Sequence, residues 1–404
     1  MRSKLSTLFF STARKVARLQ RTAWRLGMPG LFEEGAGQRK RKPAKATKTA
    51  TAAKTAAATK AGKAKKAAKT VRASKTAKVT VPLGLGTADA EPEFDPRDYA
   101  GTWKSRVYRT PPVPGAWPVR LSYFVYVPPG LRKDCPMLVM LHGCEQGATD
   151  FALGTRMHRL ADREGLLLVY PQQSRRAQRH RCWHWYQPDA AHGYAEADAI
   201  AGIAIAAIED YRVDPTRVYI AGLSAGAGMA ALAALRHPQV FAALGMHSGP
   251  VLGSARSAGE GLRAMRQGAA LPPAQALAGL LPDPEDFPGM PSIILQGDRD
   301  LVVDKRNGRQ LLAQLAWANG VDLDDSAGPE PEAAGTDRHH LRTDVPAGRG
   351  SVVTLCEVPG LGHAWSGGEG RIRFHADHGP DAARLMWQFF KSRRRVPVDV
   401  SSSA

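Results

Sequence analysis

The chain of 404 residues has few cysteines, few aromatic side chains and no long apolar run. Its four cysteines show no Cys-x-x-Cys spacing, so the sequence predicts no zinc site, no other metal and no cofactor. Disulfide-rich frameworks belong to oxidising compartments. The small number of cysteines therefore favours a reducing compartment, and we expect a cytoplasmic protein. No apolar stretch is long enough to span a membrane, which predicts that the chain has no transmembrane segment.

Acidic residues are almost absent from the first 80 positions, where 22 lysines and arginines stand against two glutamates. The remainder carries 34 basic and 35 acidic residues, so the high pI belongs to the N-terminal segment alone. Within residues 1–30 the arginines fall on one helical face and apolar residues on the other, which predicts a basic amphipathic helix. This helix either binds an anionic or apolar surface or forms an unattached leader.

Residues 31–95 form a lysine- and alanine-rich segment that has almost nothing apolar to bury, so we expect a disordered linker. Such a polycation can bind DNA or an anionic surface by counterion release, without reading sequence. The alternative is a solvated linker with no partner. Residues 96–395 then form the folded domain, which the motifs described below predict to be catalytic.

Apolar strands alternate with amphipathic helices in this domain, which predicts an α/β fold with a mostly parallel sheet and helices on both faces. The expected strands are 121–127, 137–141, 166–170, 217–221, 242–246, 292–295 and 352–358. The expected helices are 150–164, 195–210, 229–235, 305–319 and 381–391. The Gly/Pro-rich residues 250–290 are expected to form a partial lid, and the polar residues 324–349 an exposed loop.

The pentapeptide Gly222-Leu223-Ser224-Ala225-Gly226 has the pattern of a nucleophile elbow. With 40 glycines in the chain the pattern alone is weak evidence, but a β-branched run precedes it and an alanine-rich run follows it. Gly222 and Gly226 allow a strand and a helix to approach closely at the turn. The sequence therefore predicts that Ser224 is a nucleophile raised above the edge of the sheet.

An acid and a base follow the serine in the order that a serine triad requires in this kind of fold. Asp300 comes just after an apolar strand and is the predicted acid, with Asp298 as the alternative. His363 follows the last strand in a glycine-rich loop and is the predicted base. A serine hydroxyl becomes a good nucleophile only when such a base takes its proton.

Two backbone N–H groups are expected to stabilise the oxyanion, those of Cys144 and Ala225. Cys144 either pairs with Cys182 near this site or stays reduced, and the rarity of cytosolic disulfides favours the reduced state. A set of aromatic side chains either lines an apolar acyl cleft or packs in the core. That set is Trp183, Trp185, Tyr186 and Trp365.

Five motifs, in this order over residues 100–390, resemble the poly(3-hydroxybutyrate) depolymerase family of α/β-hydrolase esterases, whose relatives include feruloyl and acetylxylan esterases. They are Leu141-His-Gly-Cys-Glu-Gln146, Cys182-Trp-His-Trp-Tyr186, Gly222-Leu-Ser-Ala-Gly226, Gly297-Asp-Arg-Asp300 and Gly362-His-Ala-Trp365. The resemblance implies an α/β-hydrolase fold with Ser224 as nucleophile, Asp300 as acid and His363 as base.

The expected activity is that of a serine esterase that cleaves hydroxyalkanoate polyester or its oligomers, with the polyester granule surface as a partner. The first alternative is a feruloyl, acetylxylan or general short-chain carboxylesterase. The second is a granule- or nucleoid-binding protein that keeps a hydrolase fold as its scaffold.

Overall fold

The computed structural model describes residues 99–111, 118–281, 285–323, 328–348 and 350–395. The predicted helix of residues 1–30 and the predicted linker of residues 31–95 lie outside these ranges, so both stay predictions. Within the described ranges, no helix is both long and apolar enough to cross a membrane.

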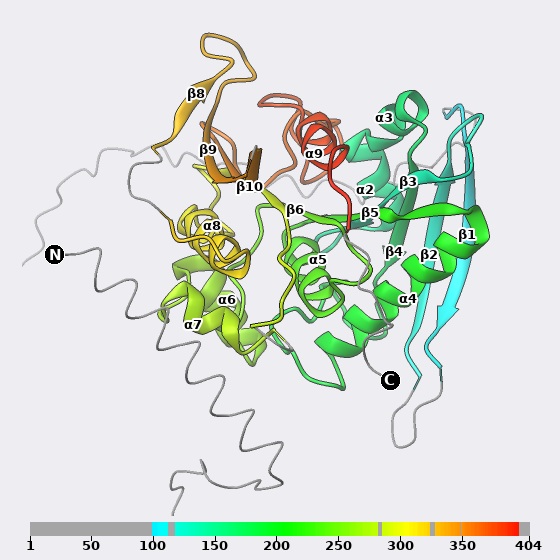
Figure 1. Cartoon of the computed structure of the whole chain (residues 1–404), viewed down its shortest axis with the longest axis horizontal. Coiled ribbons are helices and arrows are strands. Elements are labelled where there is room, and N and C mark those ends of the chain that lie inside the picture. The colour runs from blue at the N-terminus through cyan, green and yellow to red at the C-terminus, as the bar shows by residue number, and fades with distance from the viewer. Residues whose placement is uncertain (1–98, 112–117, 282–284, 324–327, 349, 396–404) are drawn as a thin grey trace, which may run out of the picture. The chain divides into compact units, whose positions relative to one another are not determined.

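A single ten-stranded sheet organises the described chain (Figure 1). Its strands are β1 (Thr102–Arg109), β2 (Arg120–Val127), β3 (Cys135–Leu141), β4 (Leu167–Gln172), β5 (Val213–Leu223), β6 (Ala243–His247), β7 (Ser292–Gly297), β8 (Glu330–Glu332), β9 (His340–Ala347) and β10 (Gly350–Val358). They lie in the order β1-β2-β4-β3-β5-β6-β7-β10-β9-β8. The six central strands, from β4 to β10 in that order, pair in parallel. The mostly parallel sheet is confirmed, and it brings the carboxyl ends of these six strands to one edge.

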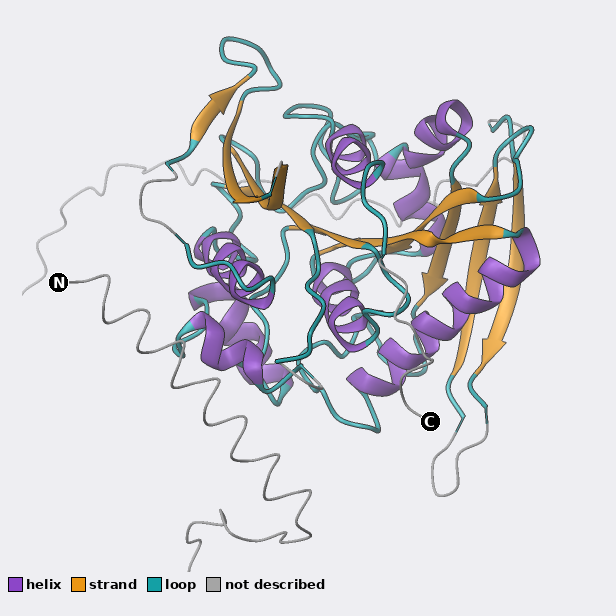
Figure 2. Cartoon of the chain, viewed as in Figure 1, coloured by secondary structure: helices purple, strands orange, loops and turns teal. Residues whose placement is uncertain are grey.

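Helices cover both faces of the sheet, as Figure 2 shows. One face carries α2 (Ala148–Thr155), α3 (Met157–Glu164) and α9 (Ala382–Phe390), and their apolar residues form one buried cluster with the sheet. The other face carries α4 (Gly193–Tyr211), α5 (Ala225–Arg236), α6 (Ala258–Gln267), α7 (Pro273–Ala278) and α8 (Arg306–Ala318), which contribute to a second cluster. The predicted α/β architecture is therefore confirmed.

The central strand β3 shows how the sequence produces this layering. All seven of its residues are buried, as expected for a parallel strand that is covered on both faces. Successive side chains alternate between the two clusters, because Met137 and Val139 pack in one and Leu138 and Met140 in the other.

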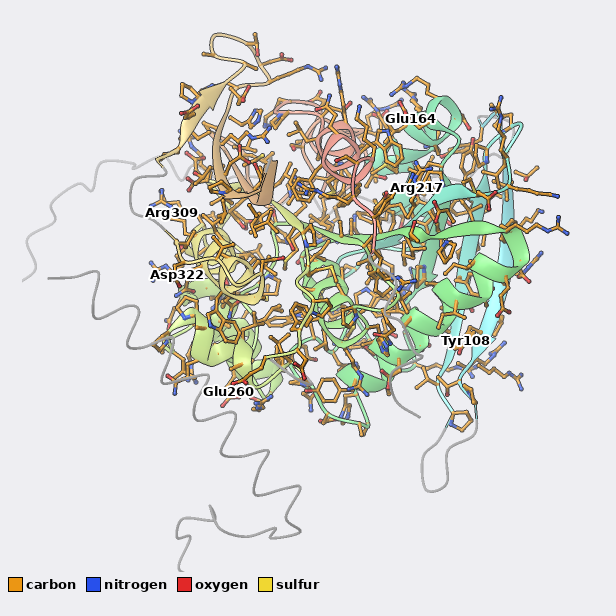
Figure 3. All side chains as sticks on the ribbon, in the orientation of Figure 1. Tyr108, Glu164, Arg217, Glu260, Arg309 and Asp322 are labelled. Atoms are coloured by element: carbon orange, nitrogen blue, oxygen red, sulfur yellow. A yellow bond between two sulfur atoms is a disulfide. The ribbon has the colours of Figure 1, made fainter. Side chains whose placement is uncertain are left out.

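Small residues set how closely the helices approach the sheet. Gly202 of α4 faces Tyr108 of β1, and a Cβ at this glycine would lie 2.1 Å from the Tyr108 hydroxyl oxygen. Figure 3 labels Tyr108, which lies beside α4. Any larger residue at position 202 would push the helix away from this edge of the sheet.

The expectation that residues 324–349 form an exposed loop is wrong in part, because this segment contains β8 and β9. β9 pairs antiparallel with β10, and β8 pairs antiparallel with β9. Within β9 the buried residues His340, Thr343 and Val345 include two polar ones, which hid the strand from a search for apolar runs. Pairing with β10 satisfies the backbone here, although the side chains are mostly polar.

One other expectation needs correction. The helix expected over residues 150–164 is two helices, α2 and α3, because Arg156 between them adopts a left-handed conformation with φ 53°. The partial lid stays a prediction, and its segment contains α6 and α7, which lie against α8. The Asn307 side-chain oxygen accepts from the Val251 N–H at 3.0 Å, and the Gln314 side-chain oxygen accepts from the Leu252 N–H at 3.0 Å. This part of the segment is therefore held by buried hydrogen bonds to α8.

Candidate active site

Ser224 lies at the sharp turn between β5 and α5, with φ 57° and ψ −123°. This strained conformation persists because the surrounding backbone leaves no alternative. A Cβ at Gly222 would lie 2.4 Å from the Gly226 carbonyl carbon, and one at Gly226 would lie 2.2 Å from the Leu141 oxygen. The Ser224 N–H donates to the His247 oxygen at 2.9 Å. Strand and helix thus touch backbone to backbone, which is the geometry that the elbow motif predicts.

Asp300 and His363 come together although 63 residues separate them in the chain. The His363 Nδ1 lies 2.7 Å from Asp300 Oδ2. The other carboxylate oxygen accepts from the N–H groups of Val302 at 2.9 Å and Val303 at 2.8 Å. Burial by itself would raise the pKa of Asp300, but these hydrogen bonds and the nearby imidazole lower it below its usual value. The carboxylate is therefore held ionised against the imidazole.

Asp298, the alternative acid, has a different position. Its side chain accepts a hydrogen bond from the Gly360 N–H at 2.7 Å, at an exposed turn. It stabilises the loop that precedes His363.

Ser224 and His363 line the same cavity, which has a volume of about 390 Å³. Apolar side chains from several elements complete its wall, namely those of Leu223, Met265, Val302 and Phe374. An open, apolar cleft of this size suits a small acyl group or one section of a longer chain. Among the described residues, no group of three His, Cys, Asp or Glu side chains is arranged so that it could hold a metal ion.

Of the two predicted oxyanion donors, Cys144 lines the same cavity, and Ala225 directly follows the cavity residue Ser224 in the chain. Next to Cys144, the Gly143 N–H donates to the Gln146 side-chain oxygen at 2.9 Å and the Glu145 N–H to the His180 oxygen at 2.6 Å. No hydrogen bond between described residues uses the N–H of Cys144 or of Ala225. Both groups thus remain available to an oxyanion, and Ala225 is the first residue of α5, where the helix dipole favours negative charge.

A buried histidine that we did not predict to be functional orients the Cys144 loop. His142 Nδ1 lies 2.8 Å from the Gly143 oxygen, and its Nε2 accepts from the Gln173 N–H at 3.1 Å. Full burial lowers its pKa to about 4, so the ring is neutral at neutral pH. The Trp183 indole N–H donates to the His142 oxygen at 2.9 Å. A histidine directly after the buried strand β3 was the sequence signal for this network.

The four aromatic residues proposed for an acyl cleft do not line this cavity. Trp183 and Trp365 are fully buried, and Trp185 is 5% exposed. Trp365 stacks on His247, with ring centroids 5.2 Å apart, and Tyr186 is half-buried against Gly261. Their burial supports the alternative that they pack in the core, because large flat rings fill the space where loops meet the sheet.

Cys144 and Cys182 form a disulfide, with their Cα atoms 4.3 Å apart. Of the two alternatives left open for Cys144, the structure has the pairing with Cys182, so the reduced state that we favoured is wrong. The bond joins two loops that both line the cavity. Cys135 and Cys356 are buried thiols, and burial raises their pKa values to about 11 and about 12. These two thiols are thus unreactive at neutral pH.

The fold and the geometry of the site indicate an α/β protein of the esterase class, and comparison with known proteins agrees. Residues 121–341 match the family model described as "Esterase PHB depolymerase", which is more than half of the chain. The chain therefore belongs to the PHB depolymerase esterase family.

Two curated relatives show how far the similarity extends. Poly(3-hydroxyalkanoate) depolymerase C of Paucimonas lemoignei is 36% identical over 129 residues, which are 32% of this chain and 31% of that protein. Feruloyl esterase B of Neurospora crassa is 32% identical over 137 residues, 33% of this chain and 46% of that protein. The similarity thus spans less than half the length of either relative.

A solved structure shares the fold. The acetyl xylan esterase from Aspergillus awamori has a TM-score of 0.53 at 19% identity, covering 67% of this chain and 94% of that one.

Proposed function

We propose that this protein is a serine carboxylic-ester hydrolase with Ser224 as nucleophile, His363 as base and Asp300 as acid. The observation that carries the proposal is the 2.7 Å contact between His363 and Asp300, with His363 and Ser224 lining one cavity. Membership of an esterase family supports the same reaction class.

The proposed reaction has two halves. His363 takes the hydroxyl proton as the Ser224 oxygen attacks the ester carbonyl carbon, and the N–H groups of Cys144 and Ala225 stabilise the oxyanion. The imidazolium then gives its proton to the departing alkoxide, which breaks the ester C–O bond and leaves an acyl-enzyme. Water, deprotonated by the same base, attacks the acyl carbon. The bond from that carbon to the Ser224 oxygen then breaks, the imidazolium returns its proton to this oxygen, and the carboxylic acid is released. Asp300 holds the imidazole tautomer and stabilises its charged form throughout.

For the substrate we propose hydroxyalkanoate polyester or its oligomers. The similarity to a poly(3-hydroxyalkanoate) depolymerase and the apolar wall of the cavity support this choice. The similarity to feruloyl esterase B supports the second candidate, an esterase for feruloyl, acetyl or other short acyl groups. In either case the polyester surface or the soluble ester is the partner, and polyanion binding by the N-terminal segment stays a prediction.

The cytoplasmic location also stays a prediction, and the disulfide between Cys144 and Cys182 weighs against it. Disulfides persist mainly in oxidising compartments. Cell fractionation combined with thiol labelling of the native protein tests both points, because a cytoplasmic protein should show four reactive thiols after denaturation.

A comparison of esters tests the proposed activity. Purified protein should hydrolyse p-nitrophenyl butyrate, and Ser224→Ala should lower the rate at least about a thousandfold. Ser254→Ala is a matched control, since its hydroxyl is buried outside the cavity. Release of 3-hydroxybutyrate from polymer granules, against release of ferulate or acetate from plant-wall esters, then separates the two candidates. Equal activity of Ser224→Ala and the native chain would contradict the triad.

A further inference from the structure

An arginine-rich loop follows β4 at the edge of the sheet where the candidate active site lies. Residues 174–181 contain four arginines and no acidic residue. The chain after residue 80 carries nearly equal numbers of basic and acidic residues, so this loop is a local excess of positive charge.

Several of these arginines line one cavity of about 390 Å³, separate from the one that contains Ser224. Its wall includes Arg120 at the start of β2, Arg175, Arg176 and Arg181, with Ser174 beside them. No carboxylate belongs to its lining. Clustered guanidinium groups repel one another, and an anion that enters the cavity reduces this repulsion. Such a cavity therefore favours anion binding.

Two carboxylates near this loop bond to groups other than its arginines. Glu145 pairs with Arg373 at 2.7 Å and with His180 at 3.4 Å. Glu196 accepts from the Gln173 side chain at 2.6 Å, on the inner side of the loop. Asp150 accepts from the Gly147 N–H at 3.0 Å.

The guanidinium groups of Arg120, Arg176 and Arg181 keep their donors for a ligand. No salt bridge between described residues involves any of the three. Because four arginines and no carboxylate line the cavity, its lining is positively charged.

The two cavities share a wall. His180 and Cys182 line the cavity of Ser224, whereas Arg181 between them lines the arginine cavity. The disulfide from Cys182 to Cys144 fixes this wall against the predicted oxyanion loop. A ligand group in the arginine cavity therefore lies one loop away from the reacting serine.

We propose that the arginine cavity binds a carboxylate carried by the ester substrate, so that the preferred substrates are anionic esters. The inference rests on the proposed esterase function and narrows its substrate class. A guanidinium group presents paired N–H donors that match the two oxygens of a carboxylate, and several such groups at one place select charge as well as shape.

Matched esters test the inference. Mono-p-nitrophenyl glutarate carries a carboxylate on its acyl side, the linear dimer of 3-hydroxybutyrate carries one on its alcohol side, and p-nitrophenyl butyrate carries none. In Arg176→Gln and Arg181→Gln we expect KM for at least one anionic ester to rise about tenfold, while kcat/KM for the neutral ester stays unchanged. Arg179→Gln is the control, because Arg179 is on the same loop, is exposed and does not line the cavity.

Each outcome has a defined meaning. A loss confined to one anionic ester identifies the side of the ester bond that carries the carboxylate, and it supports the inference. An equal loss for the neutral ester, no loss for either anionic ester, or the same loss in Arg179→Gln overturns it. If the native chain cleaves no ester, the esterase proposal fails. Calorimetric titration with 3-hydroxybutyrate then tests carboxylate binding in the arginine cavity independently of turnover. This binding must weaken in Arg176→Gln for the inference to stand.

Discussion

Replacing Asp300 with asparagine should remove nearly all turnover while the fold stays intact. One carboxylate oxygen accepts from the N–H groups of Val302 and Val303 at 2.9 and 2.8 Å. The other faces His363 Nδ1 at 2.7 Å. Only the carbonyl oxygen of asparagine can accept from the two backbone groups, so its NH₂ group must face the imidazole.

An NH₂ group in that position favours the wrong tautomer. It donates to Nδ1, which places the ring proton on Nε2 and leaves no lone pair to take the serine proton. We expect kcat to fall by about 10³–10⁴, which corresponds to about 4–5.5 kcal/mol of lost transition-state stabilisation. Stability should fall by only about 1–2 kcal/mol, because a single charge-assisted hydrogen bond is lost.

Initial rates with p-nitrophenyl butyrate, with thermal melts of both proteins, measure the two effects. Asp298→Asn is the matched control, since an asparagine oxygen can still accept from the Gly360 N–H. We expect its kcat to stay within about threefold of the native value. The reasoning is refuted if Asp300→Asn keeps more than about a tenth of the native kcat, or if Asp298→Asn suffers the larger loss.

Three further predictions concern stability. Cys182→Ser should lower the free energy of unfolding by about 4 kcal/mol in a denaturant titration, because the disulfide closes a loop with a sequence separation of 38; an unchanged midpoint contradicts this. Gly226→Ala should cost at least about 2 kcal/mol, since its Cβ meets a backbone oxygen at 2.2 Å. Gly259→Ala, in a helix with no atom within 4 Å, should gain about 0.5–1 kcal/mol in the same assay.

Burial lowers the pKa of His142 to about 4 and that of His247 to about 3, from 6.5. The unfolded chain therefore binds more protons below pH 6.5. The free energy of unfolding should fall as pH drops from 6.5 towards these values, by up to about 1.4 kcal/mol per pH unit for each ring, and urea titrations at pH 7 and pH 5 check the sign.

Strand positions along the parallel core were predictable because each strand is a short apolar run bounded by turn residues. The segment that holds β9 was not, since a strand at this side of the sheet can be largely polar and depends on a distant partner for its hydrogen bonds. The break at Arg156 was equally hidden, because arginine is a good helix former and nothing local announces its positive φ.

In the proposed site too, some features could be predicted from the order of residues along the chain, whereas others depend on which residues meet in the folded structure. The elbow around Ser224 and the acid and base after later strands follow from order and spacing. The state of Cys144 and Cys182 did not follow, because composition says only how common disulfides are and not which thiols meet. The placement of Trp183 and Trp365 in the core also required packing information, since the same aromatic types line clefts and fill cores.

The close contact of backbone with backbone at Gly222 and Gly226 has a consequence for how this protein can change over generations. The height of the Ser224 oxygen above the sheet is set by main-chain atoms, which every sequence shares, rather than by a particular arrangement of core side chains. Leucine, methionine or valine can exchange beneath the elbow at some cost in thermal tolerance, while the direction from which the oxygen approaches an acyl carbon is conserved. Proteins with this elbow can therefore change the residues at the rim of the cavity, and with them the esters that bind, while the geometry of nucleophilic attack stays the same.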